Sequence, residues 1–125
     1  MKPTNEQIKE FWERCGWKWI KRNHLVNEGT LDEHRATGYW RDPEGGRWAA
    51  EKEPDLNCLF EYAVPKLYEL GYYYELLQWN EGQHKAIINK RAVEWAVTVS
   101  DAIDKDPADA LFWACYKAFG LGGNQ

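Results

Sequence analysis

The segment YYYELLQWNEGQHKAIINKRAVEWAVTVS, residues 72–100, contains the strongest β-strand signal in the chain. Three runs rich in β-branched and aromatic residues are separated by the turn-forming sequence NEG and by a short basic segment near Lys90. Runs of this kind, joined by short polar turns, pair as antiparallel neighbours. We therefore predict a three-stranded antiparallel meander.

The last of these runs alternates apolar residues with polar ones. Successive side chains of a strand point to opposite faces of the sheet, so the alternation predicts one apolar face. We expect that face to belong to the core. Its residues are Val93, Trp95, Val97 and Val99.

Helix signals flank the meander. Before it, Asp55 is a suitable N-cap, and Gly71 ends the helix that follows. Pro65 lies inside this helix and cannot donate a backbone hydrogen bond, so we expect a kink or two short helices. After the meander, Asp106 opens a final helix with Pro107 at its first position. The apolar positions of the two helices are Leu56, Leu59, Phe60, Ala63, Leu67 and Leu70, and Leu111, Phe112, Cys115 and Phe119.

The N-terminal half begins with a helix and continues in extended form. Thr4 and Gln7 form a capping box, and Gly16 ends this first helix. From Trp17 the period of the pattern changes to two, which predicts a short strand.

A hairpin is predicted next, in the segment GYWRDPEGGRWAA, residues 38–50. Its turn runs from Asp42 to Gly45, with proline at the second position and glycine at the end. Such a turn brings Trp40 near Trp48.

These elements give the order αββαβββα and predict an α+β class, as a layered α/β/α sandwich-like domain with a mainly antiparallel sheet of about five strands. With 125 residues, 44% of them hydrophobic and 29% charged, the chain fits one domain. We assign residues 1–120 to that domain and residues 121–125 to a flexible tail. No apolar run reaches the length of a membrane span, so we expect a cytoplasmic protein without a membrane partner.

Three segments resemble a known family. They are Gly16-Trp17, the helix DLNCLFEYAVPKL from Asp55 to Leu67, and the final DPADALFWACYKAFG. Together with the meander they are similar to the phage ABA sandwich domain proteins, which are small proteins of phage and prophage genomes. The resemblance implies a layered α/β/α fold and an accessory protein in the cytoplasm of a bacterial host. It implies no reaction and brings no catalytic residue.

Residues with catalytic or metal-binding chemistry are scattered. The three histidines, at positions 24, 34 and 84, lie in different elements without metal-ligand spacing, so we expect no metal and no cofactor. Cys58, in the first turn of a helix, is the only cysteine with a faint claim to nucleophilic reactivity, and packing explains it better. The acidic run from Asp101 to Asp109 fits the capped start of a helix better than a calcium loop. The run from Glu51 to Asp55 likewise fits a solvated loop ending in an N-cap.

The chain has eight tryptophans and an uneven distribution of charge. Its net charge of −4 argues against indiscriminate binding of polyanions, although the basic residues concentrate in the aromatic N-terminal half. Stacking rings beside cations are typical of nucleotide and protein recognition. The alternative is that alternate tryptophans face the core and the cations lie on the opposite side. The candidate ligand- or partner-binding residues are Trp17, Trp19, Lys21, Arg22, Trp40, Arg41, Arg47 and Trp48.

Three functions remain open at this point. The first is a non-enzymatic, phage-encoded binding protein that uses this aromatic and basic surface on a host protein or on a second copy of itself, as a homodimer or higher oligomer. The second is a sponge that sequesters a small nucleotide-like ligand, such as a nucleotide-derived immune signal. The third is a weak binder of single-stranded nucleic acid. No convergent set of titratable residues favours an enzyme.

Overall fold

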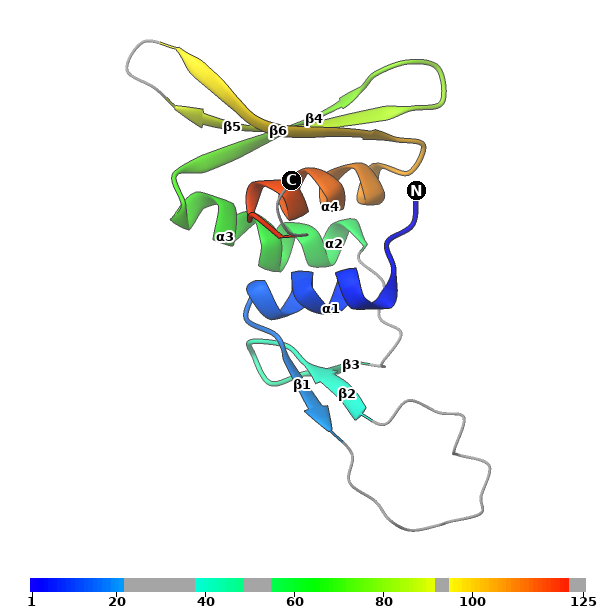
Figure 1. Ribbon diagram of the computed structural model, residues 1–125, viewed down its shortest axis with the longest axis vertical. Helices are drawn as coiled ribbons and strands as arrows, with labels where there is room; N and C mark the ends of the chain where they lie inside the picture. Colours follow the sequence, from blue (N-terminus) through cyan, green and yellow to red (C-terminus); the bar gives the residue numbers. More distant parts are fainter. Residues whose placement is uncertain (22–37, 49–54, 92–94, 122–125) are drawn as a thin grey trace.

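The computed structural model describes residues 1–21, 38–48, 55–91 and 95–121 (Figure 1). Within these residues the chain forms helices and two three-stranded antiparallel sheets, which confirms the α+β class and the antiparallel pairing. The order of elements roughly matches the predicted one. The elements are α1 (Asn5–Arg14), β1 (Lys18–Lys21), β2 (Gly38–Arg41), β3 (Arg47–Trp48), α2 (Leu56–Cys58), the π-helical turn η2 (Leu59–Ala63), α3 (Val64–Glu69), β4 (Tyr72–Gln78), β5 (His84–Arg91), β6 (Ala96–Asp104) and α4 (Pro107–Ala118).

The strands do not form the single sheet of about five strands that the sequence suggested. The first sheet has the order β1-β2-β3 and the second has the order β4-β5-β6. Helices lie between them, with α4 next to the second sheet and α1 next to the first (Figure 1). The strands of the first sheet have only two to four residues, and α1 separates them from the second sheet, so the two sheets do not join.

The core lies in the helical layer and extends to both sheets. Phe11 of α1 packs against Phe112 of α4, with ring centroids 4.4 Å apart. Trp12, also on α1, stacks on Trp17 at 4.5 Å and so connects the helix to the first sheet. On the other side, Ser100 of β6 donates a hydrogen bond to the carbonyl oxygen of Ala114 at 2.7 Å, which joins the second sheet to α4.

Pro65 is accommodated without a break in the chain of helices. The turn before it widens into η2, and the backbone N–H of Val64 reaches the carbonyl oxygen of Leu59. A π-helical turn therefore joins two short helices, α2 and α3, which agrees with the second of the two predicted alternatives. Two residues counted as apolar helix positions, Phe60 and Leu70, are exposed instead of buried.

The second sheet is the predicted meander, but one of its faces differs from the prediction. Tyr74 pairs with Ile88, and Ile88 pairs with Ser100, on the face that meets the helices. Beyond Ile88 the register shifts by a β-bulge, and this end of the sheet extends past the helices (Figure 1). The prediction of a core face on the last strand was wrong, because Val99 points away from the face on which Ser100 meets α4, and no described helix covers the end of the sheet beyond the bulge. The residues exposed there are Trp95, Val97 and Val99, and Val93 lies outside the described residues.

The domain boundaries stay a prediction. Leu121 packs at the margin of the core, and its backbone N–H bonds to the carbonyl oxygen of Tyr116 at 3.2 Å. The other residues assigned to the tail, 122–125, lie outside the described residues.

Candidate binding surfaces

Two rows of three side chains cross the first sheet, one row on each face. Directly opposite residues of antiparallel strands share a face. The register pairs Trp19 with Trp40 and Trp40 with Trp48, which makes a row of tryptophans. The next position along the strands pairs Lys18 with Arg41 and Arg41 with Arg47, which makes a row of cations.

The tryptophan row faces the core. Trp40 is only 2% exposed and meets Trp19 edge to face, with ring centroids 5.2 Å apart. Trp17, also 2% exposed, lies 5.8 Å from Trp48. We therefore correct the expectation that Trp17 and Trp40 offer rings to a ligand, because α1 and its neighbours cover them. Trp19 and Trp48 are partly buried against the same core.

The cation row lies on the outer face of the first sheet. Lys18, Arg41 and Arg47 are exposed, and the guanidinium carbon of Arg47 lies 4.9 Å from the ring centroid of Tyr39. Within the described residues, none of the three cations forms an ion pair. Like charges directly opposite one another destabilise a sheet, so this arrangement costs folding free energy.

Two further candidate cations lie at the margin of what the structure describes. Lys21 forms the last pair of β1 with Gly38, and its side chain lies outside the described residues. Arg22 lies outside them altogether. The structure thus places Arg41 and Arg47 together on the outer face, and it adds Lys18 and Tyr39 to them.

The turn between β2 and β3 is organised by the carboxylate of Asp42. One carboxylate oxygen accepts the backbone N–H groups of Glu44 and Gly46 at 2.9 and 2.8 Å, and the other accepts the indole N–H of Trp48 at 2.8 Å. Burial alone raises the pKa of Asp42, but these hydrogen bonds outweigh it and leave the pKa below its ordinary value. Burial and nearby carboxylates raise the pKa of Tyr62, which lies beside this turn.

A second candidate surface lies on the second sheet and its hairpin ends. Trp95 is 64% exposed and Trp79 is 46% exposed. The ammonium nitrogen of Lys85 lies 4.1 Å from the ring centroid of Trp79, and Lys85 stands opposite Ile103 in the register. The register places Leu77 and Ile103 on the face of Lys85 and Val97 on the face of Ile88, and Trp79 and Trp95 adjoin opposite hairpin ends. We call the whole set the apolar surface of the second sheet; its members are Leu77, Trp79, Trp95, Val97, Val99 and Ile103.

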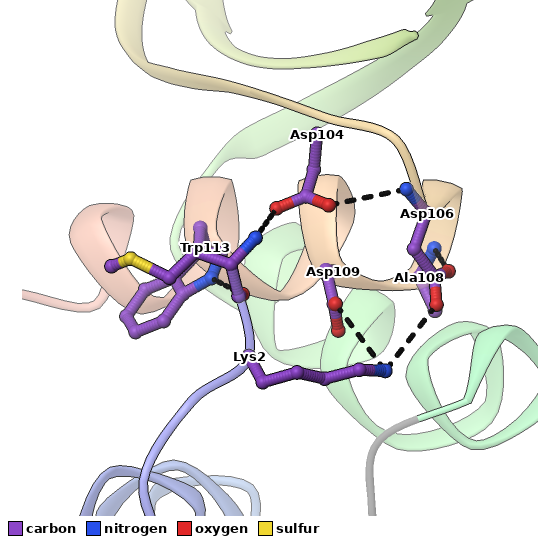
Figure 2. Close-up of polar contacts among 7 residues, drawn as sticks. Lys2, Asp104, Asp106, Ala108, Asp109 and Trp113 are labelled. Atoms are coloured by element: carbon purple, nitrogen blue, oxygen red, sulfur yellow. Dashed lines mark hydrogen bonds and ion pairs between the residues drawn. The ribbon is translucent and has the colours of Figure 1, made fainter. Parts of the chain in front are cut away.

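The acidic segment before α4 is occupied by the protein's own groups (Figure 2). Asp106 caps α4 by accepting the N–H of Ala108 at 2.8 Å, and Asp104 accepts the N–H of Asp106 and the terminal amino group. The ammonium nitrogen of Lys2 lies 3.5 Å from a carboxylate oxygen of Asp109 and 3.6 Å from one of Asp106. This is the capped start of a helix that the sequence favoured.

Cysteine and metal chemistry find no site in the described part of the chain. Cys15, Cys58 and Cys115 are buried, and burial raises the pKa of the Cys15 thiol to about 12. Burial also raises the pKa of Cys115. No three His, Cys, Asp or Glu side chains among these residues are placed to hold a metal ion, and His84 is partly buried on β5.

Comparisons with other proteins identify no relative. No family model, no curated protein and no solved structure matches this chain. In the described residues, no helix combines the length and the apolar character that crossing a bilayer requires.

Sequence reasoning missed part of each surface. Lys18 lies between Trp17 and Trp19 in the sequence, and successive side chains of a strand point to opposite faces. This alternation predicts that Lys18 lies on the face opposite the two tryptophans. Trp79 and Trp95 adjoin hairpin loops, a position that predicts exposure better than the apolar pattern does.

Proposed function

We propose that this protein is a non-enzymatic binding protein that docks onto another protein through the apolar surface of the second sheet. The observation that carries the proposal is the position of the exposed apolar side chains. Of the ten large hydrophobic residues that are exposed in the described parts of the chain, six belong to this surface. Exposed apolar side chains concentrated on one sheet and its hairpin ends favour an interaction site there, whereas single exposed hydrophobic residues need no explanation.

The chemistry of this surface suits a protein partner. Tryptophan is enriched among the side chains that dominate binding free energy at protein interfaces. The ammonium nitrogen of Lys85 lies 4.1 Å from the ring centroid of Trp79, and this contact holds one ring of the surface in place before binding. Such preorganisation lowers the entropy that association costs. A partner with its own apolar patch and a polar rim would match the surface.

Binding is favoured over catalysis by the state of the reactive groups. The described thiols are buried, and the acidic cluster before α4 is neutralised by Lys2 and by backbone N–H groups. A small protein that blocks its partner by occupancy needs affinity and no reactive group. We further propose, from the resemblance to phage ABA sandwich domain proteins, that the protein acts in the cytoplasm of a bacterial host, on a host protein or on a second copy of the chain.

The nucleotide sponge has lost part of its support. It required parallel rings beside cations, and Trp17 and Trp40 are sealed in the core. The outer face of the first sheet keeps its cations but, in the described residues, lacks a pair of parallel rings.

The experiment compares Trp95→Ser with a matched control, Tyr68→Ser. Tyr68 lies on α3, is not part of the apolar surface of the second sheet, and is 57% exposed. Both substitutions therefore remove an exposed aromatic side chain at little cost in stability. Light scattering of the purified protein measures self-association. Immobilised protein then captures partners from bacterial lysate, and each captured partner is purified and titrated against all three proteins.

We expect one partner, a second copy or a host protein, whose affinity falls at least about tenfold, or 1.4 kcal/mol, with Trp95→Ser and not with Tyr68→Ser. A protein that stays monomeric, and whose captured partners bind all three forms equally, would contradict the proposal.

A further inference from the structure

The outer face of the first sheet carries a row of three cations. Lys18, Arg41 and Arg47 stand in line on three adjacent strands, all exposed. The protein as a whole carries a net charge of −4, so this row is a local reversal of its field. This surface is separate from the apolar surface of the second sheet and does not depend on it.

The row of cations lowers the stability of the fold, and yet hydrogen bonds hold its strands in a fixed register. Each cation faces another directly across a strand pair, and no described acid forms an ion pair with any of them. At the same time, Asp42 fixes the turn between Arg41 and Arg47 through three hydrogen bonds. The fixed hairpin therefore keeps three like charges close together. Such an unfavourable arrangement is expected at a functional site, where binding of an anionic ligand would relieve the repulsion.

We propose that the outer face of the first sheet binds single-stranded nucleic acid, with its phosphates along the Lys18, Arg41 and Arg47 row and a base against the Arg47–Tyr39 pair. Neighbouring strands lie about 4.8 Å apart, so the row offers cations in steps that suit successive phosphates of one strand. Arginine forks match phosphate oxygens in two-point contacts.

The Arg47–Tyr39 pair gives the row its base-binding element. The guanidinium carbon of Arg47 lies 4.9 Å from the ring centroid of Tyr39, and Ile20 pairs with Tyr39 on the same face. Bases of single strands stack on guanidinium planes and on aromatic rings. Because Tyr39 already holds Arg47, little further side-chain entropy is lost on stacking.

Single strands fit this surface better than duplexes or acidic peptides. Three cations span only a few phosphates, and the acidic remainder of the protein repels the dense charge of a duplex. An acidic peptide could satisfy the cations but would have no base for the Arg47–Tyr39 pair.

The test measures binding of a fluorescein-labelled oligothymidylate of about twelve nucleotides by fluorescence anisotropy, across a series of salt concentrations. Three phosphate contacts predict that log K falls against log salt with a slope of about −2. Arg41→Ala and Arg47→Ala should each weaken binding and flatten the slope by about 0.7. Arg47→Lys should keep the slope and still weaken binding, because it retains the charge and loses the plane.

Arg91→Ala is the matched control. It removes the same charge, and Arg91 also lies over a tyrosine, Tyr73, but on the second sheet. It should leave both affinity and slope unchanged, as should Trp95→Ser, which tests the protein-binding surface independently. Circular dichroism confirms that each variant is folded.

Three results would overturn the inference. They are no binding at low salt, equal effects of Arg41→Ala and Arg91→Ala, and displacement of the oligothymidylate by polyglutamate or inorganic phosphate as effectively as by unlabelled oligothymidylate. None of these results bears on the binding of a protein partner by the second sheet.

Discussion

The carboxylate of Asp42 accepts a hydrogen bond from the indole N–H of Trp48, 2.8 Å away across the turn that joins β2 to β3. The same carboxylate accepts the N–H groups of Glu44 and Gly46. One buried side chain therefore closes the turn and sets the register of the hairpin. Both the tryptophan row inside and the cation row outside depend on that register.

Replacing Asp42 by alanine should destabilise the protein by about 2–3 kcal/mol, because three donors lose a charged acceptor and two of them are backbone groups. Urea denaturation followed by tryptophan fluorescence measures this loss. Glu44→Ala is the control, since Glu44 is an exposed residue of the same turn and its backbone N–H is kept. Equal losses for the two variants would mean that the carboxylate of Asp42 does not organise the turn.

The same carboxylate predicts a dependence of stability on pH. The pKa of Asp42 lies below its ordinary value of 3.8, because its hydrogen bonds outweigh the effect of burial. Its contribution to the free energy of unfolding is therefore complete above about pH 4 and is lost as the pH falls through the lowered pKa. The stability difference between wild type and Asp42→Asn should shrink on acidification below pH 4. A difference that is constant with pH would contradict this assignment.

Arg41→Thr should keep or raise the free energy of unfolding, by up to about 1 kcal/mol, because it removes like-charge repulsion on both sides of β2. The gain should fall as salt is added, since salt screens exposed charges. Thermal melts at low and high salt measure it. Arg91→Thr is the control: Arg91 stands opposite Ala96 and faces no cation in the register, so no gain is expected. A larger loss of stability for Arg41→Thr at low salt would show that the cation row is not strained.

Lys2→Met should destabilise the protein by about 1–2 kcal/mol at neutral pH, because it leaves the carboxylate of Asp109, only 3% exposed, without its cation. Burial raises the pKa of Asp109, Lys2 partly offsets this, and Asp106 and Asp104 raise it further. Without Lys2 the pKa should rise again, so the loss should grow as the pH rises from 4 to 7.

A double-mutant cycle with Asp109→Asn isolates this interaction. Lys2→Met should cost clearly less in the Asp109→Asn background, because no buried carboxylate is then left unpaired. Equal costs in both backgrounds would place the effect of Lys2 elsewhere.

The parts of the fold that could be predicted are those set by local chemistry. The caps at Thr4, Asp55 and Asp106 mark helix starts because a side-chain oxygen there accepts a nearby backbone N–H, and all three are observed. The turn after Asp42 is equally local. The division of the strands into two sheets depends on α1 packing between them, which no short stretch of sequence encodes.

For the first sheet, the sequence predicted only that tryptophans and cations alternate along the strand and therefore lie on opposite faces. The period of two separates Trp19 from Lys18, but it does not say which side a helix covers. The structure places α1 over the tryptophans, so the cations face outward. On β6 the same reasoning wrongly predicted a buried face. The register shifts at the bulge beside Ile88, the hairpin extends past the helices, and Trp95 is exposed.

The helices stand between the two sheets, so the basic row and the exposed tryptophans belong to opposite ends of the molecule (Figure 1). Whatever occupies one end leaves the other accessible. The two proposed surfaces would together make the molecule bivalent, and two occupants would be tethered at a fixed separation, each raising the effective concentration of the other.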